Sequence, residues 1–281
     1  MSRPADVHLP RPRLVVVGSG MAATRLVERL VLRNATSAWD ITVLGDEDAA
    51  PYNRILLSAV LEGTHRPEAL TLRSPQWYDG HGVALRRGTR VQAIDRQHKT
   101  LALADGTTLG YDTLVLATGS IATLPPIRGL VDPEHGGLHD AVHAFRSLAD
   151  CERLLAAVTA TDGTGEILNR RAVVVGGGLL GLQVARALGT RGVDTEIVEG
   201  GEHLLHQQIT TAAGRILARD LKKLGVAVYT GARAARLQAG DEPDSPLGLG
   251  AVRVLDPLPR NPGQVTLRLD NGFRLDTDLV I

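Results

Sequence analysis

The 281-residue sequence has one cysteine, few aromatic side chains and no net charge. The lone Cys151 excludes an intrachain disulfide, a redox dithiol and a cysteine-rich zinc or iron–sulfur site built from these residues. Aromatic residues make up 3% of the chain, too few for the stacking platforms of a single-strand nucleic-acid binder. Basic and acidic residues number 31 each, which removes the simplest electrostatic basis for nucleic-acid binding. We therefore expect no nucleic-acid partner.

Long hydrophobic runs are absent as well. No apolar stretch reaches the roughly 18 residues that a bilayer-spanning helix needs, and residues 1–13 lack the apolar core of a secretory signal. We expect no membrane partner and a cytoplasmic location, where thiols stay reduced. His203 and His206 have no further metal ligands clustered with them in the sequence, so we predict no metal site.

The sequence contains the same unit twice. An apolar run followed by the motif Gly-x-Gly-x-x-Gly/Ala occurs at residues 14–23 and again at residues 172–181. Each run is short, rich in valine and bounded by glycine, which is typical of a buried parallel strand. In both copies a helical pattern and a second apolar strand follow, and that strand leads to an acidic residue. A glycine-turn hairpin that feeds a further buried strand also repeats, at residues 105–116 and 270–281.

This repetition predicts an α/β fold with two Rossmann-like dinucleotide-binding domains of three layers. One glycine motif alone is weak support, and two glycine-rich turns without a ligand are the alternative. In each motif the first glycine permits a sharp turn, the second lets a diphosphate approach the helix N-terminus, and the third position lets the helix lie close to the strand. The residues in these three positions are Gly18, Gly20 and Ala23 in the first copy and Gly176, Gly178 and Gly181 in the second.

The acid at the end of the second strand is expected to accept hydrogen bonds from an adenosine ribose. In the first copy the candidates are Asp46 and Glu47, of which we prefer Asp46, and in the second copy it is Glu199. No arginine or lysine follows Glu199 until Arg215, so a 2′-phosphate would meet a carboxylate and no nearby cation. This favours NAD(H) over NADP(H) as the ligand of the second copy.

Three further phrases carry a family resemblance. They are Pro-Tyr-Asn-Arg-Ile-Leu-Leu-Ser at residues 51–58, Tyr-Asp-Thr-Leu-Val-Leu-Ala-Thr-Gly-Ser at 111–120 and Pro-Pro-Ile-Arg-Gly at 125–129. Together with both glycine motifs they resemble the flavoproteins of the pyridine nucleotide-disulfide oxidoreductase family, over nearly the whole chain. Within that family the sequence is most similar to the FAD/NAD-binding front end of nitrite reductase large subunits. It is also similar to rubredoxin reductases and ferredoxin reductases.

The resemblance implies an FAD-binding domain over residues 1–128 and an NAD(H)-binding domain over residues 129–281. Besides the glycine motifs and ribose acids, it implies cofactor contacts from a further set of residues. These are Arg54, Ser58, Val91 through its backbone, Ala117, Thr118 and Gly119 toward FAD, and Gln183 near the nicotinamide. Relatives commonly have Glu where Gln183 stands, and Gln keeps the hydrogen bonding but loses the charge.

The implied chemistry is hydride transfer from NADH to FAD, which needs no acid–base side chain, so we predict no catalytic residue. Because the chain has no dithiol, the electrons are expected to go to an acceptor protein or to a covalently linked iron–sulfur or sirohaem module. Two alternatives remain open from the sequence: a non-catalytic or vestigial nucleotide-binding fragment, and a reductase of rubredoxin or ferredoxin.

The last strand pattern stops at Ile281, whereas the resemblance implies that a segment then returns to complete the FAD domain. We therefore expect an FAD domain that is incomplete at the C-terminus. The corresponding hypothesis is a truncated or split gene product that binds FAD weakly.

Overall fold

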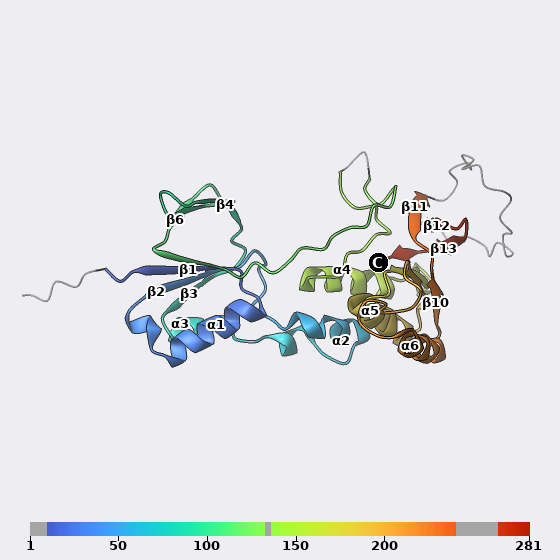
Figure 1. The fold of residues 1–281 in the computed structure, drawn as a ribbon, viewed down its shortest axis with the longest axis horizontal. Coiled ribbons are helices and arrows are strands. Elements are labelled where there is room, and N and C mark those ends of the chain that lie inside the picture. Colours follow the sequence, from blue (N-terminus) through green and yellow to red (C-terminus); the bar gives the residue numbers. More distant parts are fainter. Residues whose placement is uncertain (1–9, 133–135, 240–263) are drawn as a thin grey trace, which may run out of the picture. The chain divides into compact units, whose positions relative to one another are not determined.

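The computed structural model describes residues 10–132, 136–239 and 264–281, which form two compact units (Figure 1). The first unit comprises Met1–Leu56 and Pro67–Ile121, and the second comprises Leu57–Arg66 and Ala122–Ile281. The sequence predicts one boundary, after residue 128, and therefore places residues 57–66 in the first half. The fold places that segment in the second unit, for a reason given below. The assignment of FAD to one part and NAD(H) to the other stays a prediction.

The first unit is built on a parallel sheet with strand order β3-β2-β1-β7 and an antiparallel sheet with strand order β4-β5-β6. Its strands are β1 (Arg13–Val17), β2 (Asp40–Leu44), β3 (Val83–Arg86), β4 (Val91–Asp95), β5 (Thr100–Leu103), β6 (Thr108–Gly110) and β7 (Thr113–Leu116). Its helices are α1 (Met21–Leu32) and α3 (Pro75–Gly80), with short 3-10 turns η1 (Ala35–Ser37), η2 (Arg54–Leu56) and η3 (Pro67–Leu70).

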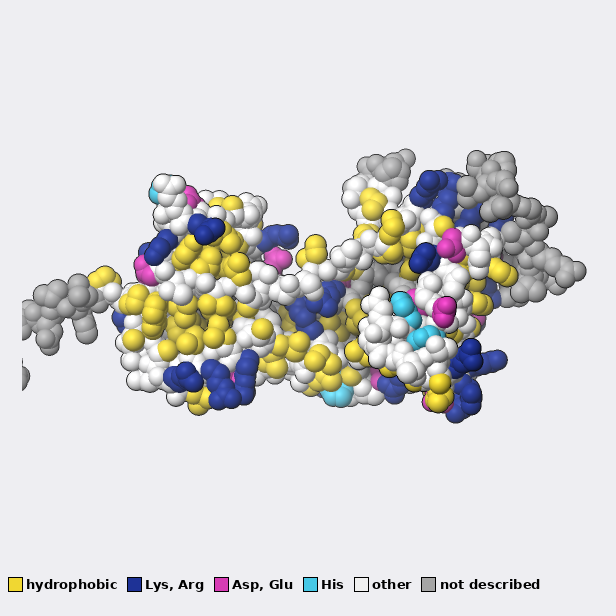
Figure 2. All heavy atoms as spheres, viewed as in Figure 1, with side chains coloured by type: hydrophobic (Ala, Val, Ile, Leu, Met, Phe, Trp, Pro, Cys, Tyr) yellow, Lys and Arg dark blue, Asp and Glu magenta, His cyan; other side chains and the backbone are white. Residues whose placement is uncertain are grey.

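Strand β1 explains the three layers of this unit. Leu14 and Val16 share a buried cluster with residues of α1 and α3, such as Val27 and Tyr78. The intervening residues of β1, such as Val15, pack instead with β5 and with Tyr111, which lies just before β7. Because successive side chains of a strand point to opposite faces, a strand covered on both sides must be apolar throughout. Hydrophobic side chains also reach the surface of this unit at the level of β1 to β3 (Figure 2).

The second unit repeats this topology, with strand orders β10-β9-β8-β14 and β11-β12-β13. Its strands are β8 (Arg171–Val175), β9 (Asp194–Glu199), β10 (Val226–Thr230), β11 (Ala234–Ala239), β12 (Val265–Leu269), β13 (Arg274–Thr277) and β14 (Leu279–Val280). Its helices are α2 (Leu57–Glu62), α4 (Leu148–Thr159), α5 (Leu179–Thr190) and α6 (Thr211–Lys223). The predicted α/β class with two Rossmann-like units is thus confirmed.

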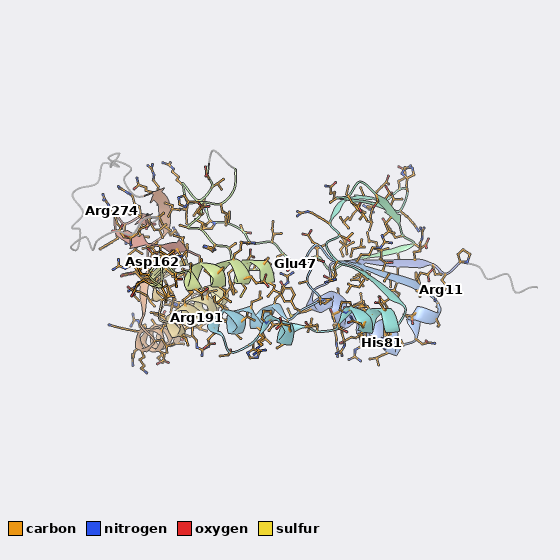
Figure 3. All side chains as sticks on the ribbon, turned by 180° about the vertical axis from the view of Figure 1, so that it is seen from behind. Arg11, Glu47, His81, Asp162, Arg191 and Arg274 are labelled. Carbon is orange, nitrogen blue, oxygen red and sulfur yellow. The ribbon has the colours of Figure 1, made fainter. Side chains whose placement is uncertain are left out.

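Helix α2 belongs to the second unit because it packs against α4 and α5. Val60 and Leu61 of α2 are buried, at 3% and 0% exposure. Arg191, at the end of α5 and labelled in Figure 3, donates a hydrogen bond to the carbonyl of Leu61. Glu62 forms an ion pair of 3.1 Å with Arg186. These contacts join segments more than 120 residues apart, which no local sequence pattern predicts.

The two copies differ in their last strand. The sequence predicts a buried strand after each hairpin, and this is correct for β14, where Leu279 and Val280 are 3% and 2% exposed. It is wrong for β7, where Leu116 is 59% exposed. Both β7 and β14 lie at an edge of their parallel sheet. The outer edge of β14 is covered by residues 141–143, since Val142 bridges Val280 and the N–H of His143 donates to Val280 O at 2.8 Å. Among the residues that the structure describes, no strand or bridge covers the outer edge of β7, and an uncovered edge strand buries less of its side chains.

The described helices are all short. The longest, α6, has 13 residues, and no described helix is long and apolar enough to cross a membrane.

One aspartate ties the end of each hairpin to the first strand of its own copy. Asp278, 5% exposed, accepts hydrogen bonds from the backbone N–H groups of Arg170 at 2.8 Å and Arg171 at 2.9 Å. Its counterpart Asp112 accepts one from the N–H of Arg13 at 2.6 Å and lies closer to solvent. An aspartate carboxylate thus accepts backbone hydrogen bonds at the start of both β1 and β8, an arrangement called the aspartate clamp below.

We expect Asp278→Ala to lower the free energy of unfolding by about 2 kcal/mol, because it leaves two part-buried N–H donors without the acceptor that they have in the fold. Asp112→Ala is the matched control and should cost less, since solvent replaces the lost acceptor. Urea unfolding at neutral pH measures both. The Arg13 N–H lowers the pKa of Asp112. The stabilisation by Asp112 is therefore present above the unfolded pKa of about 3.9 and is lost as the pH falls below it. Equal losses in the two variants would contradict the assignment of a buried aspartate clamp to Asp278.

Candidate functional site

The first glycine turn joins β1 to α1 with no room for a side chain. Gly18 has φ +107°, in the left-handed region that favours glycine. A Cβ on Gly18 would lie 2.1 Å from the carbonyl oxygen of Ala117, at the end of β7. The N–H of Gly18 donates to Leu44 O at 2.7 Å, and the N–H of Ala117 donates to Val17 O at 2.7 Å. Gly18 is therefore required both by its backbone angle and by the close approach of Ala117.

The N-termini of α1 and α5 are left without side-chain caps. Their N-cap residues, Gly20 and Gly178, make no side-chain hydrogen bond, and neither helix has an acid in its first turn. A Cβ on either glycine would meet no other part of the described chain within 4 Å. The first N–H groups of such a helix attract an anion. Both turns therefore offer an open cradle that fits a diphosphate.

Other helices of the second unit show that this lack of caps is local to the glycine motifs. Helix α4 begins with a capping box, in which Ser147 and Asp150 bond each other's backbone N–H groups. Helix α6 begins with Thr210, whose hydroxyl accepts from the N–H of Ala213. The chain thus caps its structural helices with side chains and leaves the two motif helices open to a ligand.

Ala23 and Gly181 lie where each motif helix crosses its strand. Ala23 is buried, at 1% exposure. A Cβ on Gly181 would lie 2.0 Å from the carbonyl oxygen of Gly176. The second helix therefore approaches its strand so closely that only glycine fits, whereas the first helix leaves room for a methyl group.

Glu199, the last residue of β9, holds the second turn together. Its Oε2 accepts from the N–H of Gly177 at 2.6 Å and its Oε1 accepts from the N–H of Gly201 at 2.6 Å. The residue is 8% exposed. Two backbone donors thus orient the carboxylate beside the glycine turn, the place where an adenosine ribose binds in a Rossmann fold.

The first copy places its acids differently. The register pairs Val17 with Leu44 and Val175 with Val198, so Gly45 occupies the position of Glu199. A Cβ on Gly45 would lie 2.4 Å from the hydroxyl of Ser19. The space that the Glu199 side chain fills in the second copy is therefore occupied by Ser19 in the first, and the acid comes one residue later.

Of the two candidate acids, Asp46 is open and Glu47 is engaged. The Asp46 side chain is 63% exposed and its Oδ2 lies 3.5 Å from Nη1 of Arg90. Glu47, labelled in Figure 3, accepts a hydrogen bond from Tyr52 Oη at 2.7 Å and pairs with Arg54. This arrangement favours Asp46 as the ribose acceptor and makes Glu47 a residue that positions Arg54.

Arg54 is held at the first glycine turn. Its guanidinium lies 5.2 Å from the ring centroid of Tyr52, a cation–π distance. A small pocket is lined by Arg54, Glu47 and Tyr52 together with Ser19 and Gly20 of the turn. The guanidinium is therefore close to the open N-terminus of α1, where its charge would favour an anion.

Two further segments meet at the same end of the first parallel sheet. The loop before Val91 runs beside the acids, with the N–H of Thr89 donating to Gly45 O at 2.7 Å and that of Gly88 to Glu47 O at 3.1 Å. The turn of Ala117, Thr118 and Gly119 leaves the sheet next to Gly18. Ligands of open α/β sheets bind at the carboxyl ends of the strands, which is where these residues gather.

Two predicted residues lie on helices of the second unit. Ser58 is on α2, so its contact with FAD stays a prediction. Gln183 is half-buried on α5, in the second helical turn after Gly178, and its place near the nicotinamide likewise stays a prediction.

The second turn opens into a pocket of about 340 Å³. Its lining includes Gly176, Glu199 and the glycine pair 200–201, together with His206 and Arg233. Sequence reasoning missed His206 and Arg233 as site residues. Arg233 lies 34 positions after Glu199 in the sequence and reaches the pocket from the loop between β10 and β11. The local sequence feature that could have indicated a distant side chain in this pocket is the glycine pair at residues 200 and 201, which leaves space beside Glu199.

Cys151 takes no part in either site. It is fully buried on α4, with its thiol 3.5 Å from the carbonyl oxygen of Leu57, and burial raises its pKa to about 11. Within the described ranges no group of three or more potential metal ligands gathers.

Comparison with known proteins supports the motif resemblance. The family model described as pyridine nucleotide-disulphide oxidoreductase matches residues 12–280. The nitrite reductase [NAD(P)H] of Bacillus subtilis is 36% identical over 216 residues, which are 77% of this chain and 25% of that protein. The anthranilate 1,2-dioxygenase system ferredoxin–NAD(+) reductase component of Burkholderia cepacia is 36% identical over 278 residues, 93% of this chain and 63% of that protein.

Solved structures show the same architecture. The covalent putidaredoxin reductase–putidaredoxin complex contains a chain that matches with a TM-score of 0.76 and 26% identity, covering 97% of this chain and 58% of that one. This chain thus spans about a quarter of the nitrite reductase and under two thirds of the Burkholderia cepacia reductase component and of the chain in the putidaredoxin reductase complex.

Gly178 and Gly181 of the second motif should respond to an added methyl group with very different losses of stability. Gly181→Ala pushes a Cβ into the Gly176 carbonyl, so we expect a loss of about 2 to 3 kcal/mol in the free energy of unfolding. Gly178→Ala enters open space at an ordinary φ of −76° and should cost under about 1 kcal/mol. Urea denaturation monitored by circular dichroism measures both. A Gly178→Ala variant as unstable as Gly181→Ala would show that this cradle is not open.

Proposed function

Since this chain belongs to the pyridine nucleotide-disulphide oxidoreductase family, we propose that it is the FAD- and NAD(P)H-binding part of an oxidoreductase. In this proposal it carries electrons from a reduced nicotinamide nucleotide through FAD to a second redox centre. One observation supports this above all others: the fold repeats a strand–glycine turn–helix unit, and both copies leave the helix N-terminus uncapped beside open space. A single nucleotide would need only one such cradle.

We assign FAD to the first unit, as the family resemblance implies, and the nicotinamide nucleotide to the second. The N–H groups at the starts of α1 and α5 would receive the two diphosphates, with Arg54 adding charge at the first. Asp46 and Glu199 would accept hydrogen bonds from the two adenosine riboses. The loop at Val91, the turn at 117–119, Ser58 and Gln183 complete the proposed contacts.

The chemistry belongs to the bound flavin, which accepts a hydride from the nicotinamide and can release the electrons one at a time. The chain's own task is to bind and orient the two nucleotides. No side chain is assigned to move a proton. The one thiol, Cys151, is buried and has a raised pKa, so it stays protonated and does not act as a nucleophile.

For the acceptor we propose an iron–sulfur centre outside these residues, in an arrangement like that of nitrite reductases, where a sirohaem follows. The Bacillus subtilis relative is named a nitrite reductase [NAD(P)H], which supports the nitrite reductase-like part of this assignment. The Burkholderia cepacia relative favours a second candidate, a reductase of a separate ferredoxin, because it matches 93% of this chain. A cytoplasmic location remains a prediction.

The cofactor assignment is tested by adding FAD to the purified chain without oxygen and then adding NADH. We expect the visible absorbance of the flavin to fall as it is reduced. Gly20→Ala should weaken FAD binding about tenfold and spare NADH binding, and Gly178→Ala should do the reverse, because each methyl group enters one cradle only. A chain that binds both nucleotides without flavin reduction would be a non-catalytic nucleotide-binding fragment. Loss of the same nucleotide in both variants would overturn the assignment of sites.

The acceptor is tested with the same FAD-loaded chain and NADH. We expect reduction of an added [2Fe–2S] ferredoxin, followed by its absorbance, and no consumption of nitrite when ferredoxin is omitted, because the proposed acceptor centre lies outside these residues. Gly178→Ala, which should weaken NADH binding, is the control. Ferredoxin reduction that is unchanged in this variant would not come from NADH bound in the second unit. Nitrite consumption by the chain, FAD and NADH alone would refute the assignment of the acceptor to another module.

A further inference from the structure

The pocket at the end of β9 contains a cationic side chain, that of Arg233, that the neighbouring sequence does not supply. Counting along the chain, no arginine or lysine follows Glu199 until Arg215. In space, Arg233 and His206 line the same pocket as Glu199. The inference below concerns this pocket and rests on the proposed function, because it specifies which nicotinamide nucleotide the second unit takes.

Two glycines make room for these groups. A Cβ on Gly200 would lie 2.9 Å from both Cγ and Nε of Arg233, so the arginine side chain lies across Gly200. A Cβ on Gly201 would lie 2.4 Å from Nδ1 of His206. A larger residue at position 200 or 201 would displace the side chain that now occupies that space.

The backbone of Arg233 is fixed, while its guanidinium is available. The N–H of Arg233 donates to Asp270 Oδ1 at 2.9 Å, and the N–H of Asp270 donates to Arg233 O at 2.8 Å. These bonds anchor the loop at the start of β11. Among the residues that the structure describes, no carboxylate lies within ion-pair distance of the Arg233 guanidinium. Its charge is therefore not neutralised by a partner within the described fold.

The carboxylate of Glu199 is, by contrast, partly offset. It accepts two backbone hydrogen bonds of 2.6 Å, and Nδ1 of His206 lies 3.4 Å from its Oε1. A carboxylate held in this way still accepts hydrogen bonds from ribose hydroxyls, and its repulsion of a nearby anion is reduced. The pocket thus combines an acceptor for a ribose with a cation for a phosphate.

We propose that Arg233 is a specificity-determining residue that lets the second unit bind NADPH as well as NADH. Its guanidinium pairs with the 2′-phosphate, a group for which arginine provides two parallel donors. Glu199 continues to serve the ribose of NADH, so the site accepts both nucleotides instead of excluding one. The glycines at positions 200 and 201 leave the space that Arg233 and His206 occupy, and so allow the site to bind both nucleotides.

The experiment measures binding of 2′,5′-ADP and 5′-AMP to the full chain by isothermal titration calorimetry. The two probes differ only in the 2′-phosphate, and neither requires FAD or turnover. We expect the wild-type dissociation constants of the two probes to lie within about tenfold of each other. Arg233→Gln should weaken 2′,5′-ADP about tenfold and change 5′-AMP by less than about threefold. Arg233→Lys should lose less than Arg233→Gln, because it keeps the charge.

Arg219→Gln is the matched control, since Arg219 is an exposed arginine on α6 and its removal changes the net charge equally. It should leave the affinity for both probes unchanged. Equal weakening of both probes by Arg233→Gln, or no weakening of either, would overturn the proposal, as would a wild-type chain that binds 5′-AMP but not 2′,5′-ADP. If the wild-type chain binds neither probe, the nucleotide site of the proposed function fails and this inference fails with it.

Discussion

The close approach of backbone to backbone at the glycine turns is the constraint on which both units depend. A parallel strand and the helix that follows it can bring a helix N-terminus to the end of a sheet only if the turn between them is sharp. At Gly18 in the first turn and at Gly181 on α5, the nearest carbonyl oxygen would stand 2.1 and 2.0 Å from an added Cβ, so the backbone can approach this closely only where the residue is glycine. The same compactness leaves the first N–H groups of α1 and α5 exposed and uncapped, which is the property that makes the fold a diphosphate cradle.

Within that constraint the two copies distribute side-chain volume differently. In the second copy the turn has Gly177 and the strand end has Glu199, whereas in the first the turn has Ser19 and the strand end has Gly45. Each copy allows one side chain in the space between turn and strand. When the turn supplies it, the acid must come from the next residue, and Asp46 is consequently open to solvent while Glu199 is buried and bonded. Similar sequence motifs thus produce strand-end acids that are held to different degrees.

Most of the architecture was predictable because local sequence patterns determine it. Strands buried on both faces are apolar runs, glycine marks their ends, and the repeat of strand, helix and hairpin identifies two units without any knowledge of contacts. What was not predictable depends on residues far apart. Helix α2 lies in sequence between two segments of the first unit but buries Val60 and Leu61 in the second, and β7 is more exposed than its pattern suggested because no described residue covers its outer edge. Arg233 entered the second pocket from a loop that no motif marks.

Arg233 also shows why a fingerprint read along the sequence is an incomplete guide to the charges in this pocket. The fingerprint considers the side chains that follow the acid at the strand end, and in this chain the next two residues are glycines. A glycine contributes no charge of its own, yet it leaves a volume that a neighbouring strand or loop can fill. In a parallel sheet the carboxyl ends of adjacent strands lie side by side, so the loop after β10 is the nearest source of such a side chain. The electrostatics of this pocket therefore depends on the adjacent strand's loop as much as on the motif, and glycine at 200 and 201 is what allows that loop to contribute.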